Sequence, residues 1–296
     1  MMRLPTRLPT TMGNFLRYAT GRTGVAALSS RLIHSPQSLR VLMYHDVPDS
    51  LVSHFKSHLA WLSQRFEFVR PSDLLRETQV SRRPKLLLTF DDGCADNYEL
   101  VAPLLESYDA RGLFFVCPAF ADIDREKSFR LMERSAAALG ESNRDSRWQR
   151  LSRAQIVELD QRGHGIGSHT LTHVPLAHIG EAEAALEVKQ SAKSLASWLG
   201  HDCYFFPWTY WDEITAHSLE VAAGHHRFCF SPCSGLNPWP QPPRLLARTG
   251  VDVSKPVSDL QAQLSGLQDL AYKSKREWLW RLWSSINAAG TAPPSP

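Results

Sequence analysis

Four residues combine side-chain types and spacing that suit hydrolysis at a metal ion. The carboxylates Asp91 and Asp92 are adjacent, and the imidazoles His169 and His173 lie four residues apart further along the chain. Two neutral imidazoles and one carboxylate can hold a divalent ion and still leave positions open for water or substrate. Such an ion lowers the pKa of bound water, and a second carboxylate can act as the base.

The position of the two carboxylates suggests that they divide this work. They follow the apolar run 86–90, which is typical of a buried strand. The C-terminal ends of barrel strands carry catalytic residues, and successive side chains point to opposite faces. We therefore expect one aspartate to be a base and the other a ligand, with Gly93 permitting a sharp turn beside them. By itself, an Asp-Asp-Gly sequence after a strand is more commonly a turn.

The two histidines are expected to share one face of a short helical turn. Residues at i and i+4 are neighbours on a helix, so His169 and His173 could hold the same ion there. Pro175 disfavours helix at the residue before it and should keep this turn short. A His-x-x-x-His pair without further context is more often a packing or surface pair.

Strand-like and helix-like segments alternate along most of the chain. This alternation favours parallel βα units, arranged as a barrel or an open doubly wound sheet. The predicted strands are 41–45, 66–69, 86–90, 112–117, 163–168, 203–207, 228–230 and 249–251. The clearest predicted helices are 55–66, 98–108, 151–161 with Ser152 as N-cap, and 185–199 closed by Gly200.

Composition restricts the class of protein. The 296 residues are 43% hydrophobic, enough for a full core, and a net charge of +3 does not favour nucleic acid as a partner. Five cysteines, an odd number, fit a reducing compartment better than a disulfide framework. Arginines near the N-terminus are not followed by an apolar core, so no cleaved signal is expected. These features predict a cytoplasmic protein, with the inner face of the membrane as a further option.

Several motifs together resemble the polysaccharide deacetylases, carbohydrate esterases with a NodB-like domain. The resemblance spans roughly residues 40–252 and depends mainly on the segments Thr-Phe-Asp-Asp-Gly and Ser-His-Thr-Leu-Thr-His. The motif positions are 89–93, 168–173, 42–45, 114–116 and 204–207. The family fold is a distorted (β/α)7 barrel, which becomes the expected fold class here.

The resemblance implies roles for individual residues. Asp91 matches the catalytic base. The ligands of a divalent metal, for which zinc is expected, match Asp92, His169 and His173. The metal and a backbone N–H near Phe206 would hold the oxyanion. Contacts with substrate are expected at Phe206, Pro207, Trp208 and Tyr210.

Two departures from the common family pattern point to a branch similar to the exopolysaccharide deacetylases. The third motif has Phe205 where an arginine is usual, and no Leu-x-His motif follows His226. In that branch the histidine after the first strand is the general acid, which implies this role for His45. A late arginine, Arg248, would orient Asp91, although an ordinary surface salt bridge is the alternative.

The predicted organisation is a basic lead-in (1–37), a barrel (38–255) with a rim insertion at about 121–150, and a helical segment with a disordered tail (256–296). The Trp-rich run 277–283 either caps the barrel or contacts a membrane surface.

The predicted activity is removal of the N-acetyl group from an amino sugar in a polysaccharide or glycan precursor. The partner is therefore an N-acetylated carbohydrate. A deformylase acting on a lipid-linked sugar and a catalytically silent glycan-binding module remain alternatives.

Overall fold

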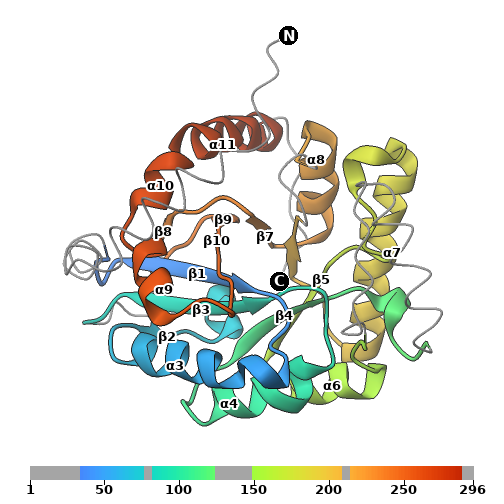
Figure 1. The fold of residues 1–296 in the computed structure, drawn as a ribbon. Helices are drawn as coiled ribbons and strands as arrows, with labels where there is room; N and C mark the ends of the chain where they lie inside the picture. Colours follow the sequence, from blue (N-terminus) through green and yellow to red (C-terminus); the bar gives the residue numbers. More distant parts are fainter. Residues whose placement is uncertain (1–33, 77–81, 124–148, 209–213, 289–296) are drawn as a thin grey trace.

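The computed structural model describes residues 34–76, 82–123, 149–208 and 214–288. Parallel strands form two sheets, one in the order β10-β1-β3-β4-β5 and one in the order β6-β7-β9, with the short strands β2 and β8 at the side (Figure 1). The bounds are β1 Ser38–Tyr44, β2 Glu67–Phe68, β3 Lys85–Phe90, β4 Gly112–Val116, β5 Gly165–Ser168, β6 Phe205–Pro207, β7 Phe228–Ser231, β8 Leu236–Pro238, β9 Leu245–Ala247 and β10 Thr249–Gly250.

The two sheets join into one distorted barrel wall. Arg248 alone separates β9 from β10, so a single stretch of chain pairs with β7 and then with β1. On the other side, β5 and β6 are not paired by backbone hydrogen bonds but lie close together. A Cβ added to Gly167 of β5 would lie 3.0 Å from the Phe205 carbonyl oxygen of β6. The α/β fold of the predicted distorted (β/α)7 barrel is confirmed.

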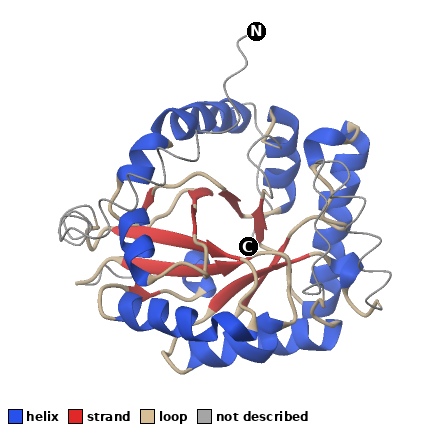
Figure 2. Ribbon diagram, in the orientation of Figure 1, coloured by secondary structure: helices blue, strands red, loops and turns tan. Residues whose placement is uncertain are grey.

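Helices enclose the strands (Figure 2). The Ser152 side chain caps α6 by accepting from the backbone N–H of Gln155, and Gly200 ends α7 at φ 77°, both as predicted. The helices are α3 Val52–Ser63, α4 Ala102–Glu106, α6 Arg153–Gln161, α7 Glu181–Leu199, α8 Ala216–His225, α9 Val257–Gln263, α10 Leu267–Ala271 and α11 Lys273–Ala288. A π-helical turn at Asn97–Val101 leads into α4, and short 3₁₀ turns lie at Asp49–Leu51, Pro71–Leu75, Pro118–Phe120 and Leu176–His178.

Alternating side chains of the strands fill two apolar layers. In β3, Leu87 packs with Phe115 and Phe230 in one cluster, whereas Leu86 and Leu88 belong to the cluster that includes α3 and α6. Every residue of β3, β4 and β5 is buried, as expected for parallel strands covered on both faces.

The helical segment after residue 255 packs closely on this wall. Arg40 of β1 is fully buried and forms two hydrogen bonds with Asp269 of α10, at 2.9 and 2.7 Å. Leu279 and Trp283 of α11 are buried, whereas Trp278 is 44% exposed. No described helix is both long and apolar enough to cross a membrane.

Three predicted parts of the domain organisation fall largely outside the described residues. They are the lead-in before residue 34, most of the rim insertion (124–148) and the tail from residue 289. The predicted domain boundaries therefore stay predictions.

Candidate active site

Three ligand atoms from distant parts of the chain meet at the C-terminal ends of β3 and β5. The Oδ1 atom of Asp92 lies 3.3 Å from Nε2 of His169 and 3.0 Å from Nε2 of His173. Within the described residues, this is the one group of three or more His, Cys, Asp or Glu side chains with ligand atoms within 4.8 Å of each other. The sequence predicted these three as ligands, and the structure brings them together.

The predicted helical turn between the two histidines is wrong. His169 follows β5, and the backbone then takes left-handed conformations at Thr170 (φ 64°) and at His173 (φ 58°). These two reversals bring the imidazoles face to edge, with centroids 4.9 Å apart and planes at 78°. Left-handed backbone costs energy at residues other than glycine, and it persists where surrounding contacts enforce it.

Glu187 of α7 supplies those contacts, and the sequence analysis did not identify it. Its carboxylate accepts hydrogen bonds from the backbone N–H groups of Leu171 (2.9 Å) and Thr172 (2.8 Å) and from the Thr172 hydroxyl (2.8 Å). Three donors on one carboxylate fix the loop between the two histidines. The only sequence signal was an acid in the second turn of the helix that follows the histidine motif.

The Asp92 turn is held just as closely. Asp92 and Gly93 both have positive φ, 74° and 64°, and a Cβ on Gly93 would lie 2.9 Å from the Val116 side chain. Glycine is therefore required at this position both by conformation and by space. Two backbone hydrogen bonds, Leu151 N–H to Gly93 and Ala95 N–H to Gln149, fasten the turn to the start of the α6 segment.

The charges at the ligand cluster favour a bound cation. Burial raises the pKa of the Asp92 carboxyl, but the imidazoles of His173 and His169 outweigh it and hold this pKa well below its usual value. Burial lowers the pKa of His169, which keeps its imidazole neutral. Among the described residues, the buried Oδ1 of Asp92 has no hydrogen-bond partner of suitable geometry. An ionised carboxylate and imidazole nitrogens that converge in this way fit a divalent metal.

Asp91 contacts Arg248 and is not a member of the ligand cluster. The guanidinium donates to both carboxylate oxygens, at 2.7 and 3.0 Å, and its Nη1 lies 3.4 Å from the Thr89 hydroxyl. The side chains are 0% and 2% exposed, so this is a buried pair and not a surface salt bridge. The two adjacent aspartates thus have different partners, as strand alternation predicted.

His45 follows β1 directly and is exposed. The loop that contains His45 is held by Asp96 and Asn97, which follow the Asp-Asp-Gly turn in the sequence. Asp96 accepts a hydrogen bond from the backbone N–H of Val47 (2.7 Å), and the Asn97 amide donates to the His45 carbonyl (3.3 Å). Burial raises the pKa of Asp96 to about 6. Neither Asp96 nor Asn97 was identified from the sequence, because loop contacts of this kind follow no regular spacing.

The predicted substrate contacts after β6 have mixed outcomes. Phe206 and Pro207 lie in β6 with buried side chains, and Pro207 has no backbone N–H, so of the two only the backbone of Phe206 could donate to an oxyanion. Trp208 is fully buried and packs edge to face on Phe206 with centroids 5.4 Å apart, so it offers no exposed face to a sugar ring. Tyr210 lies outside the described residues.

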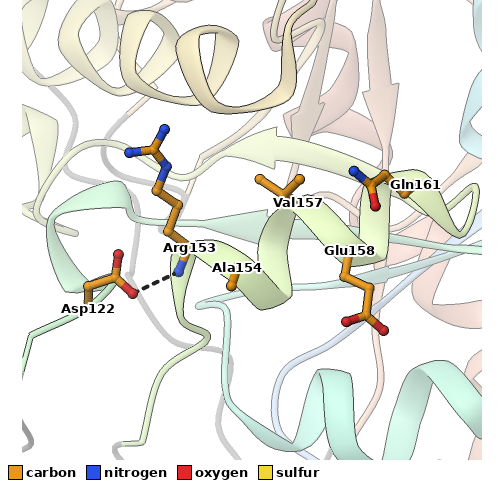
Figure 3. A pocket seen from close by; sticks show the side chains of 6 residues that line it. All are labelled: Asp122, Arg153, Ala154, Val157, Glu158 and Gln161. Carbon is orange, nitrogen blue, oxygen red and sulfur yellow. Dashed lines mark hydrogen bonds between the residues drawn. The ribbon is translucent and has the colours of Figure 1, made fainter.

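A separate hollow of about 530 Å³ runs along α6 (Figure 3). Asp122 at its edge accepts a hydrogen bond from the backbone N–H of Arg153, 3.1 Å away, and Glu158 lies further along the helix. None of its lining residues belongs to the ligand cluster or to the Asp91–Arg248 pair.

Comparison with known proteins decides the family. The polysaccharide deacetylase family model matches residues 78–225, half of the chain. The chain belongs to the polysaccharide deacetylase family. A protein of Bacillus subtilis (strain 168), YxkH, whose name assigns it to the polysaccharide deacetylases, is 25% identical over 167 residues. That match covers 53% of this chain and about half (51%) of the relative.

Solved structures with similar folds include further deacetylases. IcaB from Ammonifex degensii has a TM-score of 0.60 and 21% identity, covering 79% of this chain and 97% of its own. A de-N-acetylase from Aggregatibacter actinomycetemcomitans has a TM-score of 0.61 and 17% identity, covering 76% and 99%. The Streptococcus pyogenes deacetylase PplD, solved with acetate, has a TM-score of 0.57 and 18% identity, covering 77% and 98%. At these identities the similarity establishes that the chain has the fold of those proteins.

Proposed function

We propose that this protein is a metal-dependent deacetylase that hydrolyses the N-acetyl group of an amino sugar in a polysaccharide or glycan precursor. The observation that carries the proposal is the meeting of Asp92, His169 and His173 beside the separately held Asp91. Family membership supports deacetylation. The description of the Aggregatibacter protein as a de-N-acetylase supports an amide as the bond that is cleaved.

Asp92, His169 and His173 would hold the divalent ion, and two nitrogen donors with one oxygen donor suit zinc. When bound there, the ion makes a coordinated water more acidic and polarises the acyl carbonyl. Burial lowers the pKa of His169, which keeps its imidazole unprotonated and able to bind.

Asp91 is the proposed base that takes a proton from the attacking water. Its fork of hydrogen bonds with Arg248 fixes the plane of the carboxylate, so that little reorientation is needed during the reaction. A backbone N–H near Phe206 is the proposed second donor to the oxyanion.

His45 is the proposed acid that gives a proton to the departing amine. It is exposed at the end of β1, where a substrate can reach it. Asp96 and Asn97 hold its loop in place through hydrogen bonds. Without this proton the amine would have to leave as a strongly basic anion, so protonation must accompany cleavage.

The test is release of acetate from N-acetylated oligosaccharides, lipid-linked sugars and nucleotide sugars by the Zn²⁺-loaded protein. We expect acetate release from at least one of them. Asp92→Asn should lose both bound metal and turnover, whereas Asp91→Asn should keep the metal and lose turnover.

Two other results would replace the proposal. Release of formate in place of acetate would identify a deformylase. Binding of a glycan that is unchanged in Asp91→Asn, with no turnover by the parent protein, would identify a glycan-binding module.

A further inference from the structure

The C-terminal helices expose apolar side chains that the barrel does not cover. Leu267 and Leu270 of α10 are 45% and 68% exposed, and Trp278 of α11 is 44% exposed. Four large hydrophobic residues are exposed among the described residues, and three of them lie here; the fourth, Leu186 at 51%, is on α7. The helices α9, α10 and α11 follow one another along one side of the barrel (Figure 1).

The charges around these side chains are mainly positive. Lys273 and Arg281 are exposed, and Lys275 is partly exposed. Of the two acids in α10 and α11, Asp269 is turned inward to Arg40, and Glu277 lies 3.9 Å from Lys273. The outward surface of α10 and α11 therefore combines leucine and tryptophan with lysine and arginine, which is typical of helices that lie in a membrane interface.

A second basic segment precedes the described residues in the sequence. Residues 1–33 contain five arginines and no aspartate or glutamate. This segment joins the described chain at His34, whose Nε2 accepts a hydrogen bond from Arg40 at 3.2 Å. Because the same Arg40 binds Asp269 of α10, the start of the barrel and the exposed leucines are joined through one buried side chain.

We propose that the exposed surface of α10 and α11 (Leu267, Leu270, Trp278 and the neighbouring Lys273 and Arg281) docks on an anionic lipid bilayer. The N-terminal segment is a poor occupant of this surface because both carry positive charge. A soluble polyanion would use the cations but leave the leucines and the tryptophan in water. A bilayer with anionic headgroups uses both, since the apolar side chains enter the interface while the cations meet the headgroups.

The position of this surface leaves the candidate active site open. Arg40 pairs with Leu86 near the start of the parallel strands β1 and β3, whereas Asp91 follows the end of β3. The five-residue difference corresponds to about 16 Å along the strand. Docking near the Arg40–Asp269 contact therefore keeps the catalytic end of the strands away from the lipid.

Sedimentation with vesicles tests the proposal. The full chain is mixed with vesicles of phosphatidylcholine alone, or of equal parts phosphatidylcholine and phosphatidylglycerol, at low and high salt. We expect binding to the anionic vesicles only, weakened by salt. Leu270→Glu and Trp278→Glu should each weaken binding about tenfold or more, because each places a charge where an apolar side chain enters the interface.

The matched control is Leu186→Glu, which changes an equally exposed leucine on α7 and should bind like the parent. All variants should keep the parent's unfolding temperature and its acetate release from a soluble substrate, because none of these residues belongs to the site. Absence of binding to anionic vesicles would overturn the proposal, as would equal losses in Leu270→Glu and Leu186→Glu. Full competition by dextran sulfate combined with unchanged binding of Leu270→Glu and Trp278→Glu would also overturn it, in favour of a polyanion site. Vesicle binding and the unfolding temperature do not depend on whether the protein is a deacetylase.

Discussion

Arg248 and Asp91 form a buried ion pair in which Nη1 donates to Oδ1 at 2.7 Å and Nη2 donates to Oδ2 at 3.0 Å. Removing one member of such a pair leaves a buried charge without compensation, which costs about 3–5 kcal/mol. The guanidinium also lies 5.3 Å from the centre of the Phe115 ring, so it is packed as well as paired.

Replacing Arg248 should therefore distinguish two effects on catalysis: the orientation of the Asp91 carboxylate and the positive charge beside it. Arg248→Lys keeps the charge but loses the two-pronged contact, so we expect kcat to fall about tenfold or more while metal content is unchanged. Arg248→Ala should in addition lower the free energy of unfolding by about 3–5 kcal/mol. Denaturant unfolding, metal analysis and acetate release measure the three quantities. Equal activity of Arg248→Lys and the parent would refute the orienting role.

Glu187 should control metal affinity without being a ligand. Glu187→Ala removes the acceptor of three hydrogen bonds that hold the loop between His169 and His173, and contacts of this type are worth 10–100-fold in affinity. Glu187→Gln keeps one acceptor oxygen and should lose less. Glu183→Ala, on the exposed side of the same helix, is the control. Competition of the protein with a chromogenic Zn²⁺ chelator measures the affinity, and identical values for the Glu183 and Glu187 variants would contradict the prediction.

Zn²⁺ should stabilise the fold through the same three ligands. A ligand that binds only the folded state adds about 2.7 kcal/mol to stability at a concentration of 100 times its Kd. Thermal unfolding with Zn²⁺ and with a chelator should therefore differ clearly for the parent. For His169→Ala the two unfolding curves should nearly coincide. A similar Zn²⁺ shift in parent and variant would place the metal somewhere else.

Acidification should destabilise the protein through buried histidines outside the site. Burial lowers the pKa of His226 to about 3 and that of His164 to about 4. An unfolded histidine takes up its proton near pH 6.5, so the unfolded state binds more protons below that pH. Stability from these groups is present above about pH 6.5 and is lost as the pH falls toward 4, with a slope of up to about 1.4 kcal/mol per pH unit for each histidine.

His226→Phe tests this dependence. The His226 ring already packs 5.1 Å from the Phe206 ring, and its Nδ1 lies 3.2 Å from the Ala222 carbonyl oxygen. Chemical denaturation between pH 4 and pH 7 should show a shallower loss of stability in this variant than in the parent. His178→Gln, at an exposed position, should keep the slope of the parent. An unchanged slope in His226→Phe would show that other groups dominate.

Asp269 tests whether the helical segment after residue 255 is part of the folding unit. Asp269 receives hydrogen bonds from Arg40 and from the Ser234 hydroxyl. Asp269→Ala should cost about 3–5 kcal/mol because Arg40 remains buried without its partner. A single cooperative unfolding transition is expected in the parent. Cooperative folding of a chain ending at residue 255 with parent-like stability would instead support the boundary predicted from the sequence.

Sequence patterns predicted the positions of strands and the ends of helices wherever local periodicity determines them. Apolar runs located β1, β3 and β4, and the cap at Ser152 and the glycine at 200 located the ends of α6 and α7. The grouping of Asp92, His169 and His173 was predictable because these residue types and their order along the chain are distinctive. The pairing of Arg248 with Asp91 was predictable only through the family resemblance, since 157 positions separate the two residues.

Contacts between loops and helices were not predictable in this way. The four-residue spacing of the two histidines predicted a helical turn at 169–173. The tertiary contact from Glu187 overrides this local preference and stabilises a loop with two left-handed residues. The aromatic loop after β6 suggested a sugar platform, yet Trp208 turns inward to fill space beside Phe206. Sequence hydrophobicity does not state whether an aromatic side chain faces the core or the substrate.

The single residue between β9 and β10 has a consequence for biosynthesis. The Asp91 carboxylate is held by a guanidinium that emerges from the ribosome long after it, in the segment that joins β9 to β10. A nascent chain that ends before Arg248 would contain the three proposed metal ligands but not the partner of the proposed base. Catalytic competence of the proposed site should thus arise only after residue 248 has been made, and not gradually as the chain grows.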